Sequence, residues 1–264
     1  MIVEKRVSAR RACKIISLPW SSWNYEPQPD QNAELREKLK ELAMKYPRYG
    51  CNTLYYLLRN DGVMANHKRV ERLYRLEGLS LRLKKRKRRY RLEREVLSIC
   101  RQPDEIWSMD FIHDWTLSDR RLKCLTIIDH FSKEAPHIEA NYSIRSEDVV
   151  TELDRLKNLG RKPKTIVVDN GPEFRSKNLL IWCKENNVHL SFIQPGKPTQ
   201  NAFIESFNNI FRQLCLSANY FTTLPEAKLI IESWRKEYNS HRPHGSLNGR
   251  TPLQVAKEFG IVTA

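Results

Sequence analysis

Apolar residues recur every three or four positions through the first eighty residues, and this spacing is typical of amphipathic helices. The expected helical segments are a helix–turn–helix pair at 8–25 and single helices at 31–45, 53–60 and 66–77. The first pair is interrupted at Leu18-Pro19, and Asp61-Gly62 is a turn signal between the last two helices. The pattern therefore predicts a small all-α, helix-turn-helix-like region at 1–80.

The helix expected at 66–77 has one apolar face and one basic face. Val70, Leu73 and Tyr74 form the apolar face. The outward side chains are of the kinds that contact bases and phosphates in recognition helices, and they are His67, Lys68, Arg69, Arg72 and Arg75. An ordinary amphipathic helix with a solvated basic side has the same pattern, so both interpretations stay open.

A basic linker is predicted at 81–101. Residues 82–91 hold eight basic residues in ten and keep no hydrophobic period, so we favour an arm that orders on a phosphate backbone over a purely solvated linker. The side chains expected to contact DNA there are Lys84, Lys85, Arg86, Lys87, Arg88 and Arg89. Residues 1–100 hold 24 Lys and Arg against 11 Asp and Glu, which is +13 of the total net charge of +15. Such a field attracts polyanions, although a solvated surface would give the same count.

From residue 102 the pattern changes to short apolar strands that alternate with helices. Strands are expected at 106–115, 121–131, 136–142, 165–169 and 188–193, and helices at 146–159, 176–186, 200–217, 225–238 and 252–259. Three strands followed by alternating helices and strands predict a mixed α/β layer architecture. We assign 102–220 to a catalytic core and 221–264 to C-terminal helices of that core.

Composition narrows the class of protein. The chain is 40% apolar with six Trp, which argues against disorder. Its six cysteines are scattered without a CxxC pair, and no apolar segment has the length of a membrane span or the form of a secretory signal. We expect a folded protein of the reducing cytoplasm that has no membrane partner.

Three acidic residues are the candidate chemistry of the core. Asp110 lies within a strand, Asp169 ends the apolar strand TIVVD, and Glu205 lies in the first turns of the helix at 200–217. Strand ends project over the rim where α/β sheets bind ligands, and carboxylates from separate segments suit Mg²⁺. Two such ions roughly 4 Å apart serve phosphoryl transfer on DNA. The 35 residues between Asp169 and Glu205 carry little weight, because composition alone gives roughly one such pair by chance.

Two cationic side chains lie near these acids in the sequence. Arg212 follows Glu205 by seven residues, almost two helical turns, so both share one face of the helix. Lys197 belongs to the stretch 195–198, PGKP, which suits a mobile flap with a lysine available to phosphate. A bland surface loop has the same composition, and this alternative stays open.

The loop after Asp169 begins with Asn170 and Gly171. We expect both to shape the loop, Gly171 by allowing unusual backbone dihedrals. For Asn170 the interpretation as a plain turn residue carries equal weight.

Several segments together resemble a known family. They are WSMDF around Asp110, VVDNGPEF around Asp169, PGKPTQNAFIESFN around Glu205, YNSHRPHGSLNGRTP at 238–252, and RRACKIISLP and YPRYGCNTLYYLLRNDG near the start. They resemble the OrfB transposases of the IS-three group of insertion sequences, which share the retroviral integrase core, and they cover most of the chain in the expected order. The chain has no zipper heptads and lacks the N-terminal His-His-Cys-Cys zinc pattern of retroviral integrases.

This resemblance implies a ribonuclease-H-like catalytic core in which Asp110, Asp169 and Glu205 are catalytic and hold two Mg²⁺ or Mn²⁺ ions. It implies that Arg212 contacts the terminal DNA of the element. It also implies double-stranded DNA as partner, at the element ends and the target, an OrfA partner or fusion, and a homo-oligomer in a synaptic complex.

The expected reaction is cleavage of one strand at an element end, followed by attack of the freed 3′-hydroxyl on another phosphodiester. Two alternatives remain from the residues alone. One is a non-catalytic DNA-binding protein or inactive transposase remnant, and the other is a nuclease that cleaves without joining. Neither the terminal repeats nor the target preference can be inferred from the sequence.

Overall fold

In the part of the chain that the structure describes, five helices precede the sheet. The structure, a computed structural model, describes residues 8–26, 30–81, 100–194 and 201–261. The five helices are α1 (Ala9–Ile15), α2 (Trp20–Trp23), α3 (Ala33–Lys45), α4 (Cys51–Asn60) and α5 (His67–Leu76). Four of them lie within segments whose periodicity predicted a helix, and α4 begins two residues before the predicted 53–60, so the helical character of this region is confirmed.

Helices α3, α4 and α5 pack around an apolar core of their own, and we call these three helices with their loops (residues 30–81) the N-terminal module. Leu39, Leu54, Val70 and Leu73 are fully buried in it. The side chain of Asn66 caps α5 by accepting a hydrogen bond from the amide of Lys68 at 2.9 Å. The predicted apolar face of α5 is therefore confirmed, and its basic side chains point away from the module core.

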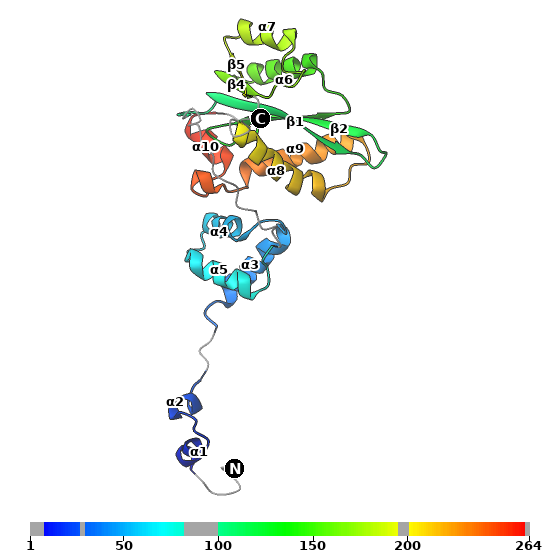
Figure 1. Cartoon of the computed structure of the whole chain (residues 1–264). Coiled ribbons are helices and arrows are strands. Elements are labelled where there is room, and N and C mark those ends of the chain that lie inside the picture. Colours follow the sequence, from blue (N-terminus) through cyan, green and yellow to red (C-terminus); the bar gives the residue numbers. More distant parts are fainter. Residues whose placement is uncertain (1–7, 27–29, 82–99, 195–200, 262–264) are drawn as a thin grey trace.

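A five-stranded mixed sheet forms the centre of the second part of the chain (Figure 1). The strands are β1 (Ile106–Trp115), β2 (Arg121–Asp129), β3 (Ile138–Asn141), β4 (Thr165–Val168) and β5 (His189–Phe192), in the order β3-β2-β1-β4-β5. Strands β1, β2 and β3 are antiparallel neighbours, whereas β4 and β5 run parallel to β1. Each of the parallel strands β4 and β5 follows a helix in the chain, since a parallel strand needs a long crossover connection. This agrees with the predicted alternation of helices and strands.

Helices cover both faces of the sheet (Figure 1). One face packs against α6 (Ser146–Asn158) and α7 (Lys177–Glu185), and the other against α8 (Ala202–Leu214) and α9 (Leu224–Ser240). A short helix, α10 (Pro252–Glu258), packs against α9, and the 3₁₀ turn η3 (Gly245–Leu247) lies between them in the chain. Within the described ranges, no helix combines the length and apolarity needed to cross a membrane.

Side chains of β1 alternate between these two layers. Trp107 and Met109 are fully buried in the core beneath α6 and α7, whereas Ile112 belongs to the core beneath α8 and α9. Because neighbouring side chains on a strand point to opposite faces, Asp110 faces the α8 layer.

The helix predicted at 200–217 ends early. Helix α8 stops at Leu214, and a separate 3₁₀ turn, η2 (Leu216–Ala218), follows. Leu216 is 2% exposed in the core that α8 and α9 share. The 3₁₀ turn therefore places the side chain of Leu216 in the core. The periodicity of apolar residues does not predict this change from α-helix to 3₁₀ turn.

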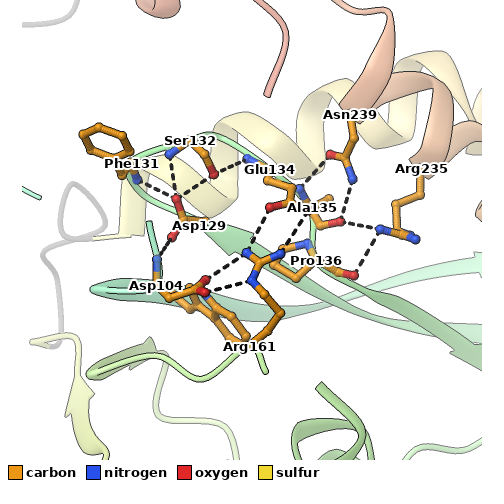
Figure 2. A network of polar contacts seen from close by, with 11 residues as sticks. Asp104, Asp129, Phe131, Ser132, Glu134, Ala135, Pro136, Arg161, Arg235 and Asn239 are labelled. Atoms are coloured by element: carbon orange, nitrogen blue, oxygen red, sulfur yellow. Dashed lines mark hydrogen bonds and ion pairs between the residues drawn. The ribbon is translucent and has the colours of Figure 1, made fainter. Parts of the chain in front are cut away.

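A buried ion-pair network lies near the start of β1 (Figure 2). Arg161 donates to both oxygens of Asp104, at 2.8 and 2.9 Å, and to both oxygens of Glu134, at 3.2 and 2.9 Å. Asp129 accepts from the amide of Asp104 at 2.8 Å and from the amide and hydroxyl of Ser132 at 2.6 and 2.8 Å. Burial raises the pKa of Glu134 and of Asp129. The network joins the chain before β1, the β2–β3 loop and the segment after α6.

Candidate metal and nucleic-acid site

Strands β1 and β4 bring Asp110 and Asp169 to neighbouring positions. The two strands are parallel, and their register pairs Ser108 with Val167. Asp110 lies two residues after Ser108 on β1, and Asp169 lies two residues after Val167, directly beyond the end of β4. Burial raises the pKa of Asp110, and the charge of Asp169 adds to this increase, as expected for carboxylates at neighbouring positions.

Asp110 is held by two hydrogen bonds that fix its carboxylate. One oxygen accepts from the amide of Phe111 at 2.8 Å, and the other accepts from the side-chain amide of Asn208 at 2.8 Å. The hydroxyl of Thr126, which lies opposite Asp110 on β2, is 2.9 Å from the side-chain oxygen of Asn208. Donation from Thr126 orients Asn208 so that its NH₂ group faces Asp110.

The loop after β4 holds the carboxylate of Asp169. The amide of Gly171 donates to it at 3.0 Å, and the side-chain amide of Asn170 donates to the carbonyl of Ile193 at 2.9 Å. Asn170 thus ties this loop to the end of β5. The expectation that Gly171 adopts an unusual backbone conformation is wrong, because it is not among the residues with positive φ. Glycine is needed here for space instead, since a Cβ would lie 2.9 Å from the Asp169 carboxylate.

Helix α8 supplies the third acid. Ile204, Phe207 and Phe211 are buried against the sheet, so the intervening Glu205 lies beside the core face and is exposed. Glu205 and Asp110 line the same groove, and after burial the charge of Glu205 is one of the smaller causes of the raised pKa of Asp110.

Glu205 and Arg212 line one open groove together with Asp110, Phe111, Ile112, His113, Asn208 and Asn209. Arg212 lies two turns after Glu205, and its guanidinium donates to the carbonyl of His113 on β1 at 3.3 Å. The groove thus combines the carboxylates of Asp110 and Glu205 with the guanidinium of Arg212.

Within the described part of the chain, the three carboxylates have no cationic side chain as partner. Among the described residues, no lysine or arginine forms an ion pair with Asp110, Asp169 or Glu205. Burial raises the pKa of Asp110 to about 6, and the charges of Asp169 and Glu205 add to this effect. Three oxygen donors with uncompensated charge are the ligand set that a hard divalent cation prefers.

We expect the raised pKa of Asp110 to make the metal-free protein less stable as pH rises. Its pKa of about 6 in the folded state lies above the ~4 of an unfolded chain, so the folded state binds more protons between these values. Asp110→Asn should therefore be more stable than wild type by about 2 kcal/mol at pH 7.5 in EDTA, a value reduced for the partial exposure of the group.

Urea unfolding at pH 4 and pH 7.5 measures this difference, which should disappear at pH 4. Adding a divalent cation at pH 7.5 should remove the advantage of Asp110→Asn. Equal stabilities of the two proteins at both pH values would contradict the raised pKa of Asp110.

The basic residues predicted to bind DNA are placed only in part. Lys68 and Arg72 are exposed on α5 and make no side-chain hydrogen bond or ion pair within the described ranges. Arg69 is bound within the module, because it donates to Asn32 at 2.7 Å and to the carbonyl of Gln31 at 2.8 Å. Arg75 forms an ion pair with the preceding turn of α5. The remaining candidates lie outside the described residues, and they are Lys197, Lys84, Lys85, Arg86, Lys87, Arg88 and Arg89.

Asn208 and Thr126 were not predicted as site residues. Asn208 lies three positions after Glu205, so it occupies the adjacent turn on nearly the same side of α8. That spacing was a usable signal in the sequence. Thr126 offered none, because its role depends on the pairing of β1 with β2.

Known protein families match the N-terminal helices and the sheet-containing part of the chain separately. The HTH-like domain family matches residues 30–89, and the integrase core domain families match residues 101–198 and 186–252. The 31.7 kDa protein of insertion element IS407 from Burkholderia multivorans is 43% identical over 95% of this chain and 91% of its own length. The transposase for insertion sequence element IS904 from Lactococcus lactis is 26% identical over 84% of this chain and 93% of its own.

A solved structure supports the fold. A chain in the simian T-cell lymphotropic virus intasome, solved in complex with the PP2A regulatory subunit B56 gamma, has a TM-score of 0.53 and 18% identity, covering 83% of this chain and 74% of that one. The predicted ribonuclease-H-like core behind a helix-turn-helix-like region is thereby confirmed. The relatives, the domain order and the fold together show that this chain belongs to the insertion-sequence transposases of the IS-three OrfB family, which carry an integrase core.

Proposed function

We propose that Asp110, Asp169 and Glu205 form the active centre of this transposase and hold two divalent ions, Mg²⁺ or Mn²⁺. The chain would then use water to cleave one phosphodiester at an element end, and the freed 3′-hydroxyl would attack a target phosphodiester, forming a new P–O bond and displacing the 3′-oxygen of the target strand. The observation that carries the proposal is that Asp110 and Glu205 line one groove open to solvent, that Asp169 directly follows the neighbouring parallel strand β4, and that none of the three has a cationic partner among the described residues. Such a set repels itself unless cations compensate its charge.

The donor set suits hard divalent ions on chemical grounds. All three groups are carboxylates, and the groove leaves room for water and phosphate oxygens to complete a coordination shell. Bound there, two such ions would activate the attacking oxygen and stabilise the leaving one. No cysteine is among the described residues that line the groove, so none of these residues offers a soft thiolate ligand.

Residues of the chain itself fix the geometry of the centre. Asn208 orients Asp110, and the amide of Gly171 holds Asp169. Arg212, at the far end of the groove, can neutralise a phosphate of the bound strand. Positioning of this kind lowers the barrier, because the reacting groups are ordered before the reaction begins.

The N-terminal module and the basic linker are proposed to bind double-stranded DNA. Lys68 and Arg72 are exposed and unpaired within the described ranges, so they are available to phosphates or base edges. Because transposition joins two element ends to one target, we expect at least two copies of the chain in the reacting complex. An OrfA partner or fusion would supply further contacts with the ends.

A joining reaction with pre-cut ends tests the proposed function. The purified chain is incubated in Mg²⁺ with a labelled end duplex that carries a terminal 3′-hydroxyl, and in parallel with its 3′-deoxy counterpart. We expect joined products only from the hydroxyl end. Nicked but never joined duplexes would favour a nuclease, and tight binding without either product would favour a non-catalytic DNA-binding protein.

Asn208→Leu should lower the cleavage rate by about 10- to 100-fold, as is usual when a group that orients a metal ligand is lost. The carboxylate of Asp110 then loses the donor that fixes its orientation. Single-turnover cleavage of an end duplex measures the effect, and raising the Mg²⁺ concentration should recover part of it. Asn178→Leu is the matched control, because it removes only a surface hydrogen bond to Glu147 on the far face of the sheet. Equal rates for the two variants would exclude a positioning role for Asn208.

A further inference from the structure

The loop that joins α3 to α4 contacts the end of the catalytic helix. The guanidinium of Arg48 donates to the carbonyl of Gln213, which is the residue after Arg212 on α8, and to the carbonyl of Ser217 at 3.0 Å. The last carbonyls of a helix lack partners within the helix and carry its partial negative charge. Arg48 therefore acts as a cap supplied by the N-terminal module to the helix that bears Glu205.

A second contact is made by the neighbouring Tyr49. Its ring stacks on Tyr46 at 4.7 Å, and the guanidinium of Arg242, just after α9, lies 4.7 Å from its ring centre. The Nε and Nη1 atoms of Arg242 are buried and have no hydrogen-bond partner within the described part of the chain. The face of Tyr49 thus gives the half-buried guanidinium of Arg242 a cation–π contact.

A third contact joins α4 to the loop after η3. The side-chain amide of Asn60 donates to the carbonyl of Gly249 at 3.3 Å. Gly249 has a φ of +83°, and a Cβ built on it would overlap the ring of Tyr56. The close approach of α4 to this loop therefore requires glycine at that position.

These contacts hold together two separately folded parts (Figure 1). The apolar core of the module shares no residue with the two cores of the catalytic part. A hollow lined by Tyr46 and Tyr49 on one side and Trp234 and Glu237 on the other remains between them. Polar interfaces of this kind allow relative motion by default, so specific contacts must set the arrangement.

We infer that Arg48 and Tyr49 are positioning residues that dock the N-terminal module in cis on the end of α8. The N-terminal module, which is proposed to bind the element end, and the active centre then move as one body. The distance along the DNA between them is constant, and this determines which phosphate lies beside Asp110 and Glu205. The docking is read from the contacts above, while its effect on cleavage rests on the proposed function.

Amide hydrogen exchange of the full-length chain tests the docking without any activity. Arg48→Ala should raise exchange rates in residues 215–218 about tenfold, because the capping contacts restrain that end of α8. Arg48→Lys should give an intermediate increase, since an ammonium can reach one carbonyl but not hold both. Arg59→Ala is the matched control, because Arg59 stacks on Tyr55 inside the module. Equal exchange in the Arg48→Ala and Arg59→Ala variants would overturn the docking.

Cleavage of an end duplex at saturating enzyme then tests the positioning. Arg48→Ala should cut about 10- to 100-fold more slowly and should spread its cuts over neighbouring phosphates, while the Kd for the duplex stays within about twofold of wild type. Tyr49→Leu should act in the same direction. Faster exchange with an unchanged rate and cut position would overturn the positioning role. If the wild-type chain cuts no duplex, the proposed function is contradicted. The exchange rates would still show whether the N-terminal module docks on α8.

Discussion

Asp169→Asn is expected to abolish strand cleavage and strand transfer, with a loss of roughly 10³-fold or more, while the affinity for end DNA stays within about twofold of wild type. The carboxylate of Asp169 lies beside Asp110 and is held by the amide of Gly171, so an amide side chain would keep its shape and lose its charge. Removing one negative charge does not weaken attraction to a polyanion. Binding and catalysis should therefore separate in this variant.

Asp110→Asn and Glu205→Gln should behave in the same way, and any pair of these substitutions should cost little more than one. Groups that act as a unit show such non-additivity, because the first loss already disables the unit. Asp114→Asn on the same strand and Glu147→Gln on α6 are the matched controls. Additive losses, or equal losses in the controls, would contradict a shared centre.

Arg161→Ala should destabilise the catalytic part by about 3–5 kcal/mol, the usual cost of breaking a buried ion pair from one side. Arg161 is 6% exposed and Glu134 is 1% exposed, so the variant leaves the Glu134 carboxylate buried without its partner (Figure 2). Glu134 can escape this penalty by binding a proton, since burial has already raised its pKa. The destabilisation should therefore be larger at pH 8 than at pH 5.

Urea unfolding of the variant at the two pH values measures this effect. Arg155→Ala, on α6, is the matched control, because Arg155 is 62% exposed and pairs with Glu152 at 3.5 Å. Exposed pairs contribute about 1 kcal/mol or less. A similar loss of stability in both variants, or no dependence on pH, would show that the Arg161 network does not stabilise the core.

Local patterns predicted most of the fold. The apolar periodicity of α5 and the alternation along β1 determine which faces are buried, and the structure has both as expected. Asp169 could be placed at the end of a strand because a loop signal follows it directly. Glu205 could be placed beside the core face because Ile204 and Phe207 mark the buried stripe of α8.

Features that depend on contacts between distant segments escaped prediction. Thr126 reaches Asn208 only because β2 pairs with β1, and Arg48 reaches Gln213 across 165 positions of sequence. Gly171 was predicted for its backbone freedom, although the space beside Asp169 is what requires it. The domain boundaries, the metal ions and the DNA contacts of the basic linker stay predictions.

Direct measurement of bound metal tests the central claim most closely. Mn²⁺ is titrated into the chain bound to an end duplex that cannot be cleaved, with wild type, Asp169→Asn and Asp114→Asn compared at pH 7.5. We predict two ions for each active site in wild type and in Asp114→Asn, and the loss of at least one in Asp169→Asn. The same number of ions in all three proteins would contradict an active centre formed by Asp110, Asp169 and Glu205.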